Sequence, residues 1–451
     1  MAAINHVKLS DAITNNRFSA EFFDPQYVFK PNNSVVWVPI GRVLKKCEYG
    51  ISISMNIDGK GFPIFRMNEL ENCFALRPEK FAAITNQVFE QYRLNENDVL
   101  FNRTNSFEFV GRTGLVKDQT DCTFASYLIR LVPNSNAILP EYLAVYLNTK
   151  FGIGQIKRRA MRSINQANVS GSEVRKILIP LFPSSIQEEI AELVNCSYRL
   201  TKNSEVAYTK AQQLLDSELG LDKLRFDKPV GYTARFSDVS LSYRTDAQHY
   251  QPHFVQLLEH LSQYSSKRIR EIRRYNRRGI QPVYIENGSH SVINSQHLGV
   301  KHINYDGLQK TTEHIFNTSP EAHIQKDDLL IYTTGAYIGR TNVYLDDTPA
   351  FASNHVNILR LSPEIDHAYM AIVLQSIVGQ FQTQKHARGS AQAELYPADI
   401  DKFIVPLLNP KTQKDIGDLV RESLVKQRES AQLLKQAKTR VEQLIERAVQ
   451  E

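Results

Sequence analysis

Ile177-Leu-Ile-Pro-Leu181 recurs later in the chain as Phe403-Ile-Val-Pro-Leu407, and each copy leads into a long helix-forming segment. Both copies have the apolar, β-branched residues of a short buried strand, with a proline near its end. The segments that follow carry apolar residues at alternating three- and four-residue intervals. Such a seam favours packing against another helix. The fold should therefore contain two copies of a strand followed by a long, partnered helix.

The duplication extends over almost the whole chain. Matching stretches lie between about 225 and 230 residues apart, a separation that chance matches would not maintain. The other matched pairs are Phe18–Tyr27 with Thr245–Phe254, Gly50-Ile51 with Gly279-Ile280, Asp98–Phe101 with Asp328–Ile331, Gly111–Thr113 with Gly339–Thr341, and Phe124–Ser126 with Phe351–Ser353. A period this long indicates duplicated domains, because solenoid units are only about 20 to 50 residues long.

Each half has the same order of predicted elements. Short β-type runs separated by Gly, Asn and Pro precede a helix (140–159 and 363–386), and the strand and long helix come last. We therefore predict an α+β fold with two tandem similar domains, each a mixed or antiparallel sheet with helices. The predicted domains are 1–183 and 223–408, and the long helices are 184–222 and 409–451.

The two long helices are expected to pair as an antiparallel coiled coil and to act as a ruler between the domains. At about 1.5 Å per residue, each would span on the order of 55 to 60 Å. The seam residues are Ile186, Ile190, Leu193, Leu200, Ala207, Ala211 and Leu214 in the first helix, and Ile416, Val420, Leu434, Ala437, Val441, Leu444 and Ala448 in the second. Ser423, Gln427 and Ser430 interrupt the second seam. The alternative is that each helix folds back on its own domain.

Composition sets loose bounds on function. The 451 residues carry a formal net charge of +6 at pH 7, which is compatible with nucleic acid but does not establish it. Four cysteines (Cys47, Cys73, Cys122 and Cys196) lie in the first half without zinc-site spacing, a pattern typical of reduced cytoplasmic thiols. No signal segment or apolar run of about 18 residues occurs, so we expect a cytoplasmic protein without a membrane segment.

Catalytic motifs are missing from the sequence. It has no phosphate-binding Gly-x-x-x-x-Gly-Lys loop, no His-Glu-x-x-His metal site and no glycine-rich turn suited to S-adenosylmethionine. Asp24-Pro-Gln-Tyr27 is similar to the Asp/Asn-Pro-Pro-Tyr/Phe tetrad of amino-methyltransferases, but it lacks the second proline and its repeat counterpart has no acid. We therefore expect a binding protein without catalytic residues, metal or cofactor of its own.

Polar loops at equivalent places in the two halves are the candidate binding sites. One pair follows the Asp-x-Leu strands, and the other follows the predicted helices. Arginine suits guanine, asparagine suits adenine, and Ser, Thr and Tyr suit phosphates or bases. The candidate DNA-binding residues are Asn102, Arg103, Thr104, Asn105, Ser106, Arg162, Asn165 and Gln166 in the first half, and Tyr332, Thr333, Thr334, Tyr337, Arg388, Ser390 and Gln392 in the second. Ordinary turn chemistry is the alternative.

Two clusters of basic residues add to these loops. Lys267–Arg278 holds seven Lys or Arg against one Glu, and Lys157-Arg158-Arg159 with Arg162 forms the other cluster. From the first run, Arg273, Arg274 and Arg277 are candidates for contact with nucleic acid. The alternative for either cluster is a solvated helix face.

In the order of its motifs, the chain resembles the specificity (S) subunit of type I restriction–modification systems. The residues that carry the resemblance are Asp246-Ala-x-x-Tyr-x-Pro252 with its twin Ser19–Pro25, Arg388-Gly-Ser-Ala-Gln392 through Tyr396–Ile400 to Val405-Pro406, and Pro180 with Gln187 and Pro406 with Gln413. The resemblance covers essentially the whole chain. The first half departs from it at Ser163–Gln166, where the family often has a Gly-Ser-x-Gln stretch.

The resemblance implies a subunit that selects a DNA site for other subunits. Each domain would be a target-recognition domain that reads one half of an asymmetric, split double-stranded DNA sequence in the major groove, and the helices would set the spacer. Two modification subunits would supply the adenine methyltransferase with S-adenosylmethionine, and restriction subunits with ATP and Mg would join for cleavage. A partner that fuses methylase and nuclease fits equally well.

Two other classes of function stay open at this point. One is a non-catalytic scaffold or regulator, whose coiled coil binds protein partners without reading DNA. The other is an enzyme with a site that the motifs do not reveal. Salt-dependent binding to duplex DNA separates the first of these from the specificity subunit, because release of counterions makes affinity fall steeply with salt.

Overall fold

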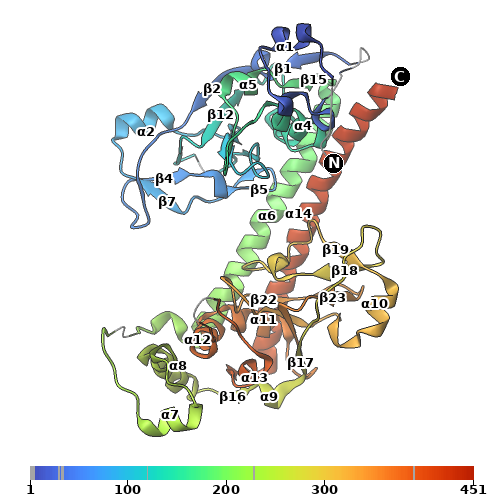
Figure 1. Ribbon diagram of the computed structural model, residues 1–451. Coiled ribbons are helices and arrows are strands. Elements are labelled where there is room, and N and C mark those ends of the chain that lie inside the picture. Colours follow the sequence, from blue (N-terminus) through green and yellow to red (C-terminus); the bar gives the residue numbers. More distant parts are fainter. Residues whose placement is uncertain are drawn as a thin grey trace. The chain divides into compact units, whose positions relative to one another are not determined.

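The computed structural model describes residues 6–28, 31, 35–118, 120–226, 229–389 and 392–450, with side chains as far as residue 447. The chain divides into two compact units (Figure 1). Unit 1 comprises residues 1–202 and 427–451, and unit 2 comprises residues 203–426. Each unit therefore combines one half of the duplication with parts of both long helices.

Unit 1 alternates short strands with short helices, as its closely spaced Gly, Asn and Pro residues predict. Its helices are α1 Leu9–Asn15, α2 Asn86–Tyr92, α3 Pro140–Leu147, α4 Lys150–Arg159, α5 Gly171–Arg175 and the first part of α6 Ser184–Glu218. Its strands are β1 Trp37–Pro39, β2 Leu44–Tyr49, β3 Met55–Asn56, β4 Phe62–Phe65, β5 Leu70–Glu71, β6 Phe74–Ala75, β7 Lys80–Ala82, β8 Val99–Asn102, β9 Thr104–Asn105, β10 Thr113–Leu115, β11 Thr123–Phe124, β12 Leu128–Pro133, β13 Met161–Arg162, β14 Ala167–Asn168 and β15 Leu178–Pro180.

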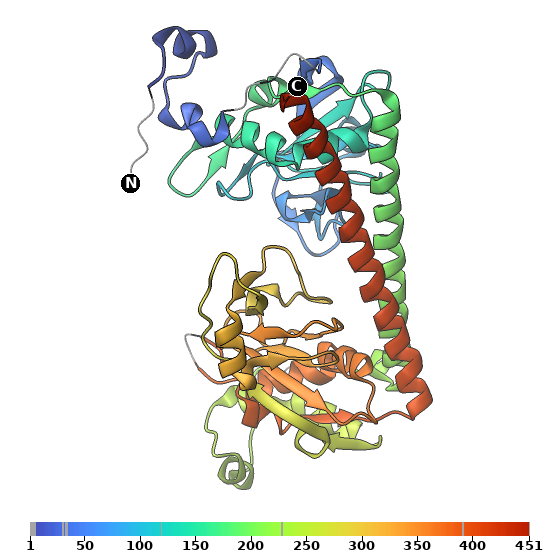
Figure 2. The same cartoon turned by 90° about the vertical axis from the view of Figure 1, so that its right-hand side faces the viewer.

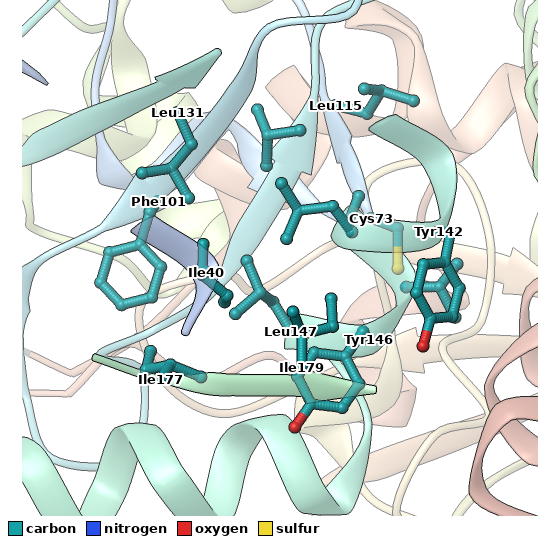
Figure 3. Packing of buried hydrophobic residues seen from close by; sticks show 14 of the residues in the cluster. Ile40, Cys73, Phe101, Leu115, Leu131, Tyr142, Tyr146, Leu147, Ile177 and Ile179 are labelled. Carbon is teal, nitrogen blue, oxygen red and sulfur yellow. The ribbon is translucent and has the colours of Figure 1, made fainter. Parts of the chain in front are cut away.

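The described strands of unit 1 form a mixed sheet in the order β2-β12-β8-β10-β6-β5, with smaller sheets β11-β4-β7-β3, β13-β14-β9 and β1-β15. One buried cluster joins Phe101 of the sheet to Tyr142 of α3 and Ile179 of β15 (Figure 3). The C-terminal part of α14 (Pro410–Gln450) contributes Leu434, Ala437, Val441 and Ile445 to this cluster. Unit 1 therefore needs the far end of the chain to complete its core.

Unit 2 repeats this arrangement. Its helices are the last part of α6, α7 Phe236–Ser242, α8 Pro252–Leu261, α9 Ile269–Ile272, α10 Glu313–Thr318, α11 His367–Gln375, α12 Ile377–His386, α13 Pro397–Ile400 and the first part of α14. Its strands are β16 Ser266–Arg268, β17 Arg273–Arg278, β18 His290–Ile293, β19 Gln309–Thr311, β20 His323–Ile324, β21 Leu329–Tyr332, β22 Thr341–Val343, β23 Ala350–Ala352, β24 Val356–Leu361 and β25 Ile404–Pro406. The sheets, over the described strands, are β17-β24-β21-β22, β19-β18-β23-β20 and β16-β25.

Equivalent hydrogen bonds confirm the duplication at the level of atoms. The hydroxyl of Tyr142 donates to the carbonyl of Pro180 at 2.7 Å, and that of Tyr369 donates to Pro406 at 2.9 Å. The same equivalence holds for Gln155 and Gln382, Thr113 and Thr341, and Gln187 and Gln413. Each proline-terminated strand is thus fixed to its helix in the same way, and the predicted α+β class is confirmed.

The long helices lie side by side and run in opposite directions within each unit (Figures 1 and 2). In unit 1, Arg440 of α14 donates to Glu189 near the start of α6 at 2.9 Å, and Ser197 farther along α6 meets Ser430 at 2.8 Å. Residue numbers therefore rise along one helix as they fall along the other. The predicted antiparallel pairing is confirmed. The seam residues Ile416, Val420, Leu434, Ala437 and Val441 are buried, Leu444 is half-buried, and the side chain of Ala448 lies outside the described residues.

Ser423 and Ser430 do not interrupt the interface, in contrast to the sequence prediction. In unit 1, Ser197 also donates to the carbonyl of Ser430 at 3.1 Å. In unit 2, Ser204 donates to the carbonyl of Ser423 at 2.8 Å and lies 3.0 Å from its hydroxyl. All four serines are buried. Their hydroxyls satisfy one another and the partner backbone, so polar layers continue the apolar seam.

The helix predicted over 140–159 is two helices, α3 and α4, and the one predicted over 363–386 is α11 and α12. Thr149 starts α4 by accepting a hydrogen bond from the amide of Gly152 at 3.2 Å, and Ser376 starts α12 by accepting one from Val378 at 3.2 Å. The capping residue itself has an extended backbone, so the preceding helix ends before it. The apolar periodicity continues across both breaks, which is why the sequence did not reveal them.

Candidate nucleic-acid interface

The structure brings together the two predicted loops of unit 1, which lie more than 50 residues apart in the sequence. Strand β9 of the first loop pairs with β14 of the second, so that Asn105 lies opposite Ala167 and Thr104 opposite Asn168. The Asn168 side-chain amide donates to the Thr104 hydroxyl at 2.8 Å, and Arg103 donates to the Asn168 side-chain oxygen at 3.1 Å. Backbone pairing and side-chain bonds therefore fix the two loops as one element.

The outer part of this element is a hairpin that we name hairpin 1, residues 161–168. Strands β13 and β14 pair in it, and the amide of Ser163 donates to the carbonyl of Gln166 at 2.7 Å across the turn. Arg162, Asn165 and Gln166 are all exposed. The guanidinium of Arg162 also lies 3.6 Å from the centre of the Phe107 ring. Hairpin 1 thus presents one cation and two amides on a rigid base.

Unit 2 builds an equivalent element, which we name loop 2, with its described base at Arg388 and Glu394. The backbones of these two residues exchange hydrogen bonds at 2.8 and 2.7 Å, and Glu394 also bridges to Thr334 of the other predicted loop. Arg388, Gln392 and Tyr337 are exposed. Ser390 lies outside the described residues. The same pairing of two distant loops therefore occurs in both units.

Three predicted contact residues lie inside the protein, which corrects the sequence analysis. Asn102 and Thr333 are fully buried, and Thr334 is 6% exposed. The Asn102 amide donates to the carbonyl of Phe109 at 3.3 Å, and the Thr333 hydroxyl donates to that of His355 at 2.9 Å. Side chains buried in this way cannot meet a duplex, and the bonds of Asn102 and Thr333 hold the loops from within. The pattern of short polar residues after a strand did not distinguish these inner positions from the outer ones.

The other first-loop residues are half-buried. Arg103 donates to the carbonyl of Ser126 at 3.3 Å and lies 4.9 Å from the centre of the Tyr49 ring. The side chain of Asn105 accepts from the amide of Ser106 at 2.8 Å. The side chains of Arg103 and Asn105 thus make intramolecular contacts that stabilise the loop. In unit 2 the corresponding Tyr332 is also half-buried. Its ring lies edge-on to that of Tyr337, with 6.3 Å between the ring centres.

Only part of the basic run in unit 2 is available to a ligand. The run forms β16, α9 and β17 rather than a helix face. Arg273 forms a two-point ion pair with Asp401, with one contact at 2.8 Å, so this predicted contact residue is structural. Arg274 and Arg277 are exposed. These two keep their predicted role as candidates for phosphate contact.

The basic cluster at 157–159 in unit 1 is likewise internal. Lys157 is buried and donates to the carbonyls of Glu108 at 2.8 Å and Val110 at 3.3 Å, and burial lowers its pKa to about 8. Arg159 pairs with Glu173 at 3.2 Å. The cluster therefore reinforces the base of hairpin 1 instead of presenting charge to solvent.

Two partly exposed arginines lie beside these loops: Arg278, the last residue of the predicted basic run, and Arg340, which was not among the predicted contact residues. The guanidinium of Arg340 lies 3.8 Å from the centre of the Tyr337 ring, and that of Arg278 lies 4.6 Å from the centre of Tyr396. A guanidinium held over an aromatic ring is restrained and ready for a planar partner. The repeated Gly-Arg-Thr stretch, at Gly339–Thr341, was the available signal for Arg340.

Neither a metal site nor a membrane segment is found in the described part of the chain. Over those residues, no group of three or more His, Cys, Asp or Glu side chains could hold a metal ion. None of the helices in the same ranges combines the length and apolar character that crossing a membrane requires.

Comparison with known families decides which proteins share this plan. The family model described as "Type I restriction modification DNA specificity domain" matches the chain twice, at residues 38–205 and 265–435. The chain belongs to this family. The two matched regions of this specificity-domain protein correspond to the two halves of the duplication, and each contains one pair of the loops described above.

Two relatives of the specificity family match part of the chain. One is assigned as the type I restriction enzyme MjaX specificity subunit of Methanocaldococcus jannaschii, with 28% identity over 157 residues. The other is the type I restriction enzyme EcoKI specificity subunit of Escherichia coli, with 27% identity over 177 residues. These alignments cover 34% and 38% of this chain and 37% of either relative, so the chain spans well under two thirds of their length.

Among solved structures, that of a type I restriction-modification system S subunit from M. genitalium resembles the chain. The TM-score is 0.49 and the sequence identity is 14%, with coverage of 93% of this chain and 98% of that one.

Proposed function

We propose that this chain is a DNA-specificity subunit, which reads a two-part duplex target and brings catalytic partner subunits to it. Unit 1 reads one half of the target through hairpin 1, and unit 2 reads the other half through loop 2. The observation that carries this proposal is the pairing of two distant polar loops into one element, made at equivalent places in both units.

The chemistry of the exposed side chains supports base recognition. Arg162, Asn165 and Gln166 are the residue types that form two-point hydrogen bonds with guanine and adenine in the major groove. Arg274 and Arg277 suit phosphates, which position a protein on DNA without reading sequence. The surface therefore offers both kinds of contact that a specific complex needs.

Unlike loops on a repeated frame favour an asymmetric target. Hairpin 1 presents an arginine and two amides, whereas the predicted contact residues that are exposed in the paired loops of unit 2 are Arg388, Gln392 and Tyr337. Because different side chains select different bases, the two half-sequences should differ. The paired long helices would then fix how many unread base pairs separate them.

The catalytic steps belong to partners in this proposal, and the chain itself is non-catalytic. Two modification subunits would bind S-adenosylmethionine and methylate adenine, one at each half of the target. Restriction subunits, or a fused methylase–nuclease, would add cleavage that depends on ATP and Mg. In this scheme the residues of this chain only bind and orient DNA.

Mapping methylated adenines in the genome of a host that carries the chain and its methyltransferase partner tests the proposal. The expected result is one split motif with two unlike halves and a fixed spacer, which disappears when the chain is deleted. A matched chain with Arg162, Asn165 and Gln166 replaced by alanine should alter only one half of the motif. Methylation that is independent of the chain would overturn the proposal.

Binding measurements separate this proposal from the scaffold alternative. The complex of chain and partner should bind target duplex with an affinity that falls steeply with salt, with a logarithmic slope of about −0.9 for each neutralised phosphate. A scaffold would leave the affinity of the partner for DNA unchanged. Equal affinity for target and scrambled duplex would contradict the reading role.

A further inference from the structure

Two repeated segments lie outside the regions that match the specificity family. We name them arm 1, residues 7–27, and arm 2, residues 234–254; both precede the matched regions, which start at 38 and 265. Each arm carries a seven-residue helix, α1 or α7, that ends in a left-handed residue, Asn16 or Tyr243. Their repeat at the same spacing as the rest of the chain shows that they belong to the duplicated unit.

The helices of the arms bury little apolar surface, although Phe22 of arm 1 and Phe254 of arm 2 are themselves buried. Helix α7 has no buried residue, and in α1 only Ala12 is buried. Besides these buried aromatic side chains, each arm makes a set of polar contacts to one place, the C-terminus of the helix that precedes hairpin 1 or loop 2.

In unit 1 this contact centres on Arg17 of arm 1. Its guanidinium donates to the carbonyl of Arg159, the last residue of α4, at 3.4 Å and pairs with Glu173 at 3.2 Å. Arg158 of the same helix end donates back to the carbonyl of Phe22, the buried aromatic residue of the arm, at 2.9 Å. Glu173 lies just after hairpin 1, so Arg17 touches the chain on both sides of it.

Unit 2 makes the same contact with Arg244, the repeat equivalent of Arg17. Its guanidinium donates to the carbonyl of His386, the last residue of α12, at 3.2 Å and to that of Ala387 at 2.9 Å. Lys385 donates back to the carbonyl of His249, a buried residue of arm 2 and the repeat equivalent of Phe22, at 2.9 Å. The bonds between arm and helix end are therefore equivalent in the two units, whereas the carboxylate partner differs, Glu173 for Arg17 and Asp246 for Arg244.

Each arginine contacts the chain at the helix end that directly precedes a candidate DNA-binding loop. The last carbonyls of a helix lack helical partners and carry partial negative charge, which a cation stabilises. Hairpin 1 starts at Met161, directly after the C-cap of α4, and the base of loop 2 starts at Arg388, directly after the C-cap of α12. The arginine therefore restrains the direction in which the chain leaves each helix.

We propose that Arg17 and Arg244 are positioning residues, each of which orients the loop that reads one half of the DNA target. They act through the helix end and do not touch DNA. The inference rests on the proposed function, and it assigns to the arms a role in selecting bases, one half-sequence for each arm.

Hydrogen exchange on the full chain tests the positioning without DNA. The measured groups are the amides of Arg388 and Glu394, which hydrogen-bond to each other's carbonyls at the base of loop 2. Arg244→Gln should speed their exchange by about tenfold, because local opening of the loop becomes easier. The matched control is Arg235→Gln, an exposed arginine on the same arm whose side chain makes no capping bond. Equal exchange rates in the wild type and Arg244→Gln would overturn the inference.

Binding by the complex of chain and methyltransferase tests the consequence for selection. Wild-type discrimination against a single changed base pair is typically about 5- to 150-fold. Arg244→Gln should bring this ratio toward 1 in one half of the target, and Arg17→Gln should do so in the other half. Arg244→Lys should retain part of the discrimination, because an ammonium can hold one carbonyl but not the two-carbonyl geometry of the guanidinium.

The outcomes separate the inference from the proposed function. A loss shared equally by both halves, or a fall in melting temperature that accounts for the loss, would mean that Arg244 is merely structural. If Arg244→Gln does not fold, Arg17→Gln and its amides at hairpin 1 decide. If the wild-type complex shows no sequence preference at all, the proposed function fails, while the exchange experiment still decides whether the arms hold the loops.

Discussion

Asn168 donates its side-chain amide to the hydroxyl of Thr104 at 2.8 Å, although the two residues lie 64 positions apart in the sequence. The same Asn168 accepts from Arg103 at 3.1 Å. One side chain thus joins the hairpin to the preceding loop with both its donor and its acceptor. Arg103 and Thr104 are half-buried and therefore form part of the surface. The hydrogen bonds of Asn168 restrain the shape of this surface, which DNA would meet.

Asn168→Ala should relax the reading of one half of the target. It removes two hydrogen bonds, each worth about 1 kcal/mol, and leaves the hairpin free to shift. Competition between duplexes with single changes in either half measures the effect, and the untouched half serves as the internal control. Unchanged discrimination in both halves would mean that this link is not needed for recognition.

The exposed tip of hairpin 1 should carry direct base contacts. Replacing Asn165 or Gln166 by alanine should cost about 1–3 kcal/mol of discrimination at the base pair it contacts, with little change at other positions. Methylated-motif mapping and binding to single-change duplexes check this. The matched control is Asn136→Ala, an exposed asparagine outside the hairpin. A uniform loss over all sequences would identify these amides as phosphate ligands instead.

Substitutions at different arginines of the basic strand β17 should have different effects, some on DNA affinity and others on stability. Arg274→Gln with Arg277→Gln should weaken binding to every duplex and reduce the salt slope by about 0.9 for each phosphate that is no longer neutralised, without changing the melting temperature. Arg273→Gln is the matched comparison, and it should lower the melting temperature because it leaves Asp401 without its two-point partner. A shift in base preference after the double change would show that the strand reads bases.

Insertions should lengthen the spacer only when made in both long helices. Seven residues after Thr201 and seven after Gln427 lie between the two serine layers and preserve the helix face, since seven residues complete one heptad. They add roughly 10 Å, or about three base pairs. Motif mapping should give the old half-sequences with the longer spacer. An insertion in α6 alone should mismatch the layers and lower the melting temperature. An unchanged spacer in the double insertion would rule out the ruler.

Acid should weaken unit 2 through His386. Burial, then the neighbouring His249 and Lys385, lower the pKa of His386 from its ordinary 6.5 to about 3, although Asp399 opposes the shift. The folded unit keeps this histidine neutral while the unfolded chain binds a proton, so stability is lost as the pH falls from about 6.5 toward 3. His386→Phe should flatten the fall in melting temperature over this range. The exposed His314→Phe is the control, and equal pH curves for all three proteins would contradict the assignment.

The features that the sequence predicted are those written in local patterns. Apolar intervals predicted the long helices, because helical periodicity is visible among neighbouring residues. The fixed separation of repeated stretches predicted the duplication, because matching residues can be compared without knowledge of the fold. What could not be predicted depends on partners distant in sequence. Arg273 looks like a surface cation until Asp401, 128 residues away, is placed beside it. In the sequence Asn102 has the features of an exposed loop residue, but in the fold it is buried and donates to the carbonyl of Phe109.

The serines of the helix interface were also misjudged from the sequence, because they were predicted to interrupt an interface to which they belong. A hydroxyl in an apolar seam reads as an interruption when only one helix is considered. Ser430 becomes an interface residue because Ser197 comes to lie 2.8 Å from it, 233 residues away. Sequence periodicity records where a helix is apolar, whereas the pairing of polar groups is a property of two helices together.

The core of unit 1 requires Leu434, Ala437, Val441 and Ile445, which are made long after the rest of that unit. At a synthesis rate of about 5–20 residues per second, the ribosome supplies them on the order of tens of seconds later. Unit 2, whose parts are contiguous, can close first. The half of the molecule that is translated first thus becomes complete last. On the proposed function, a nascent chain would hold its first DNA-binding surface unfinished until the second is built, and this order of synthesis would disfavour binding of DNA by an incomplete chain.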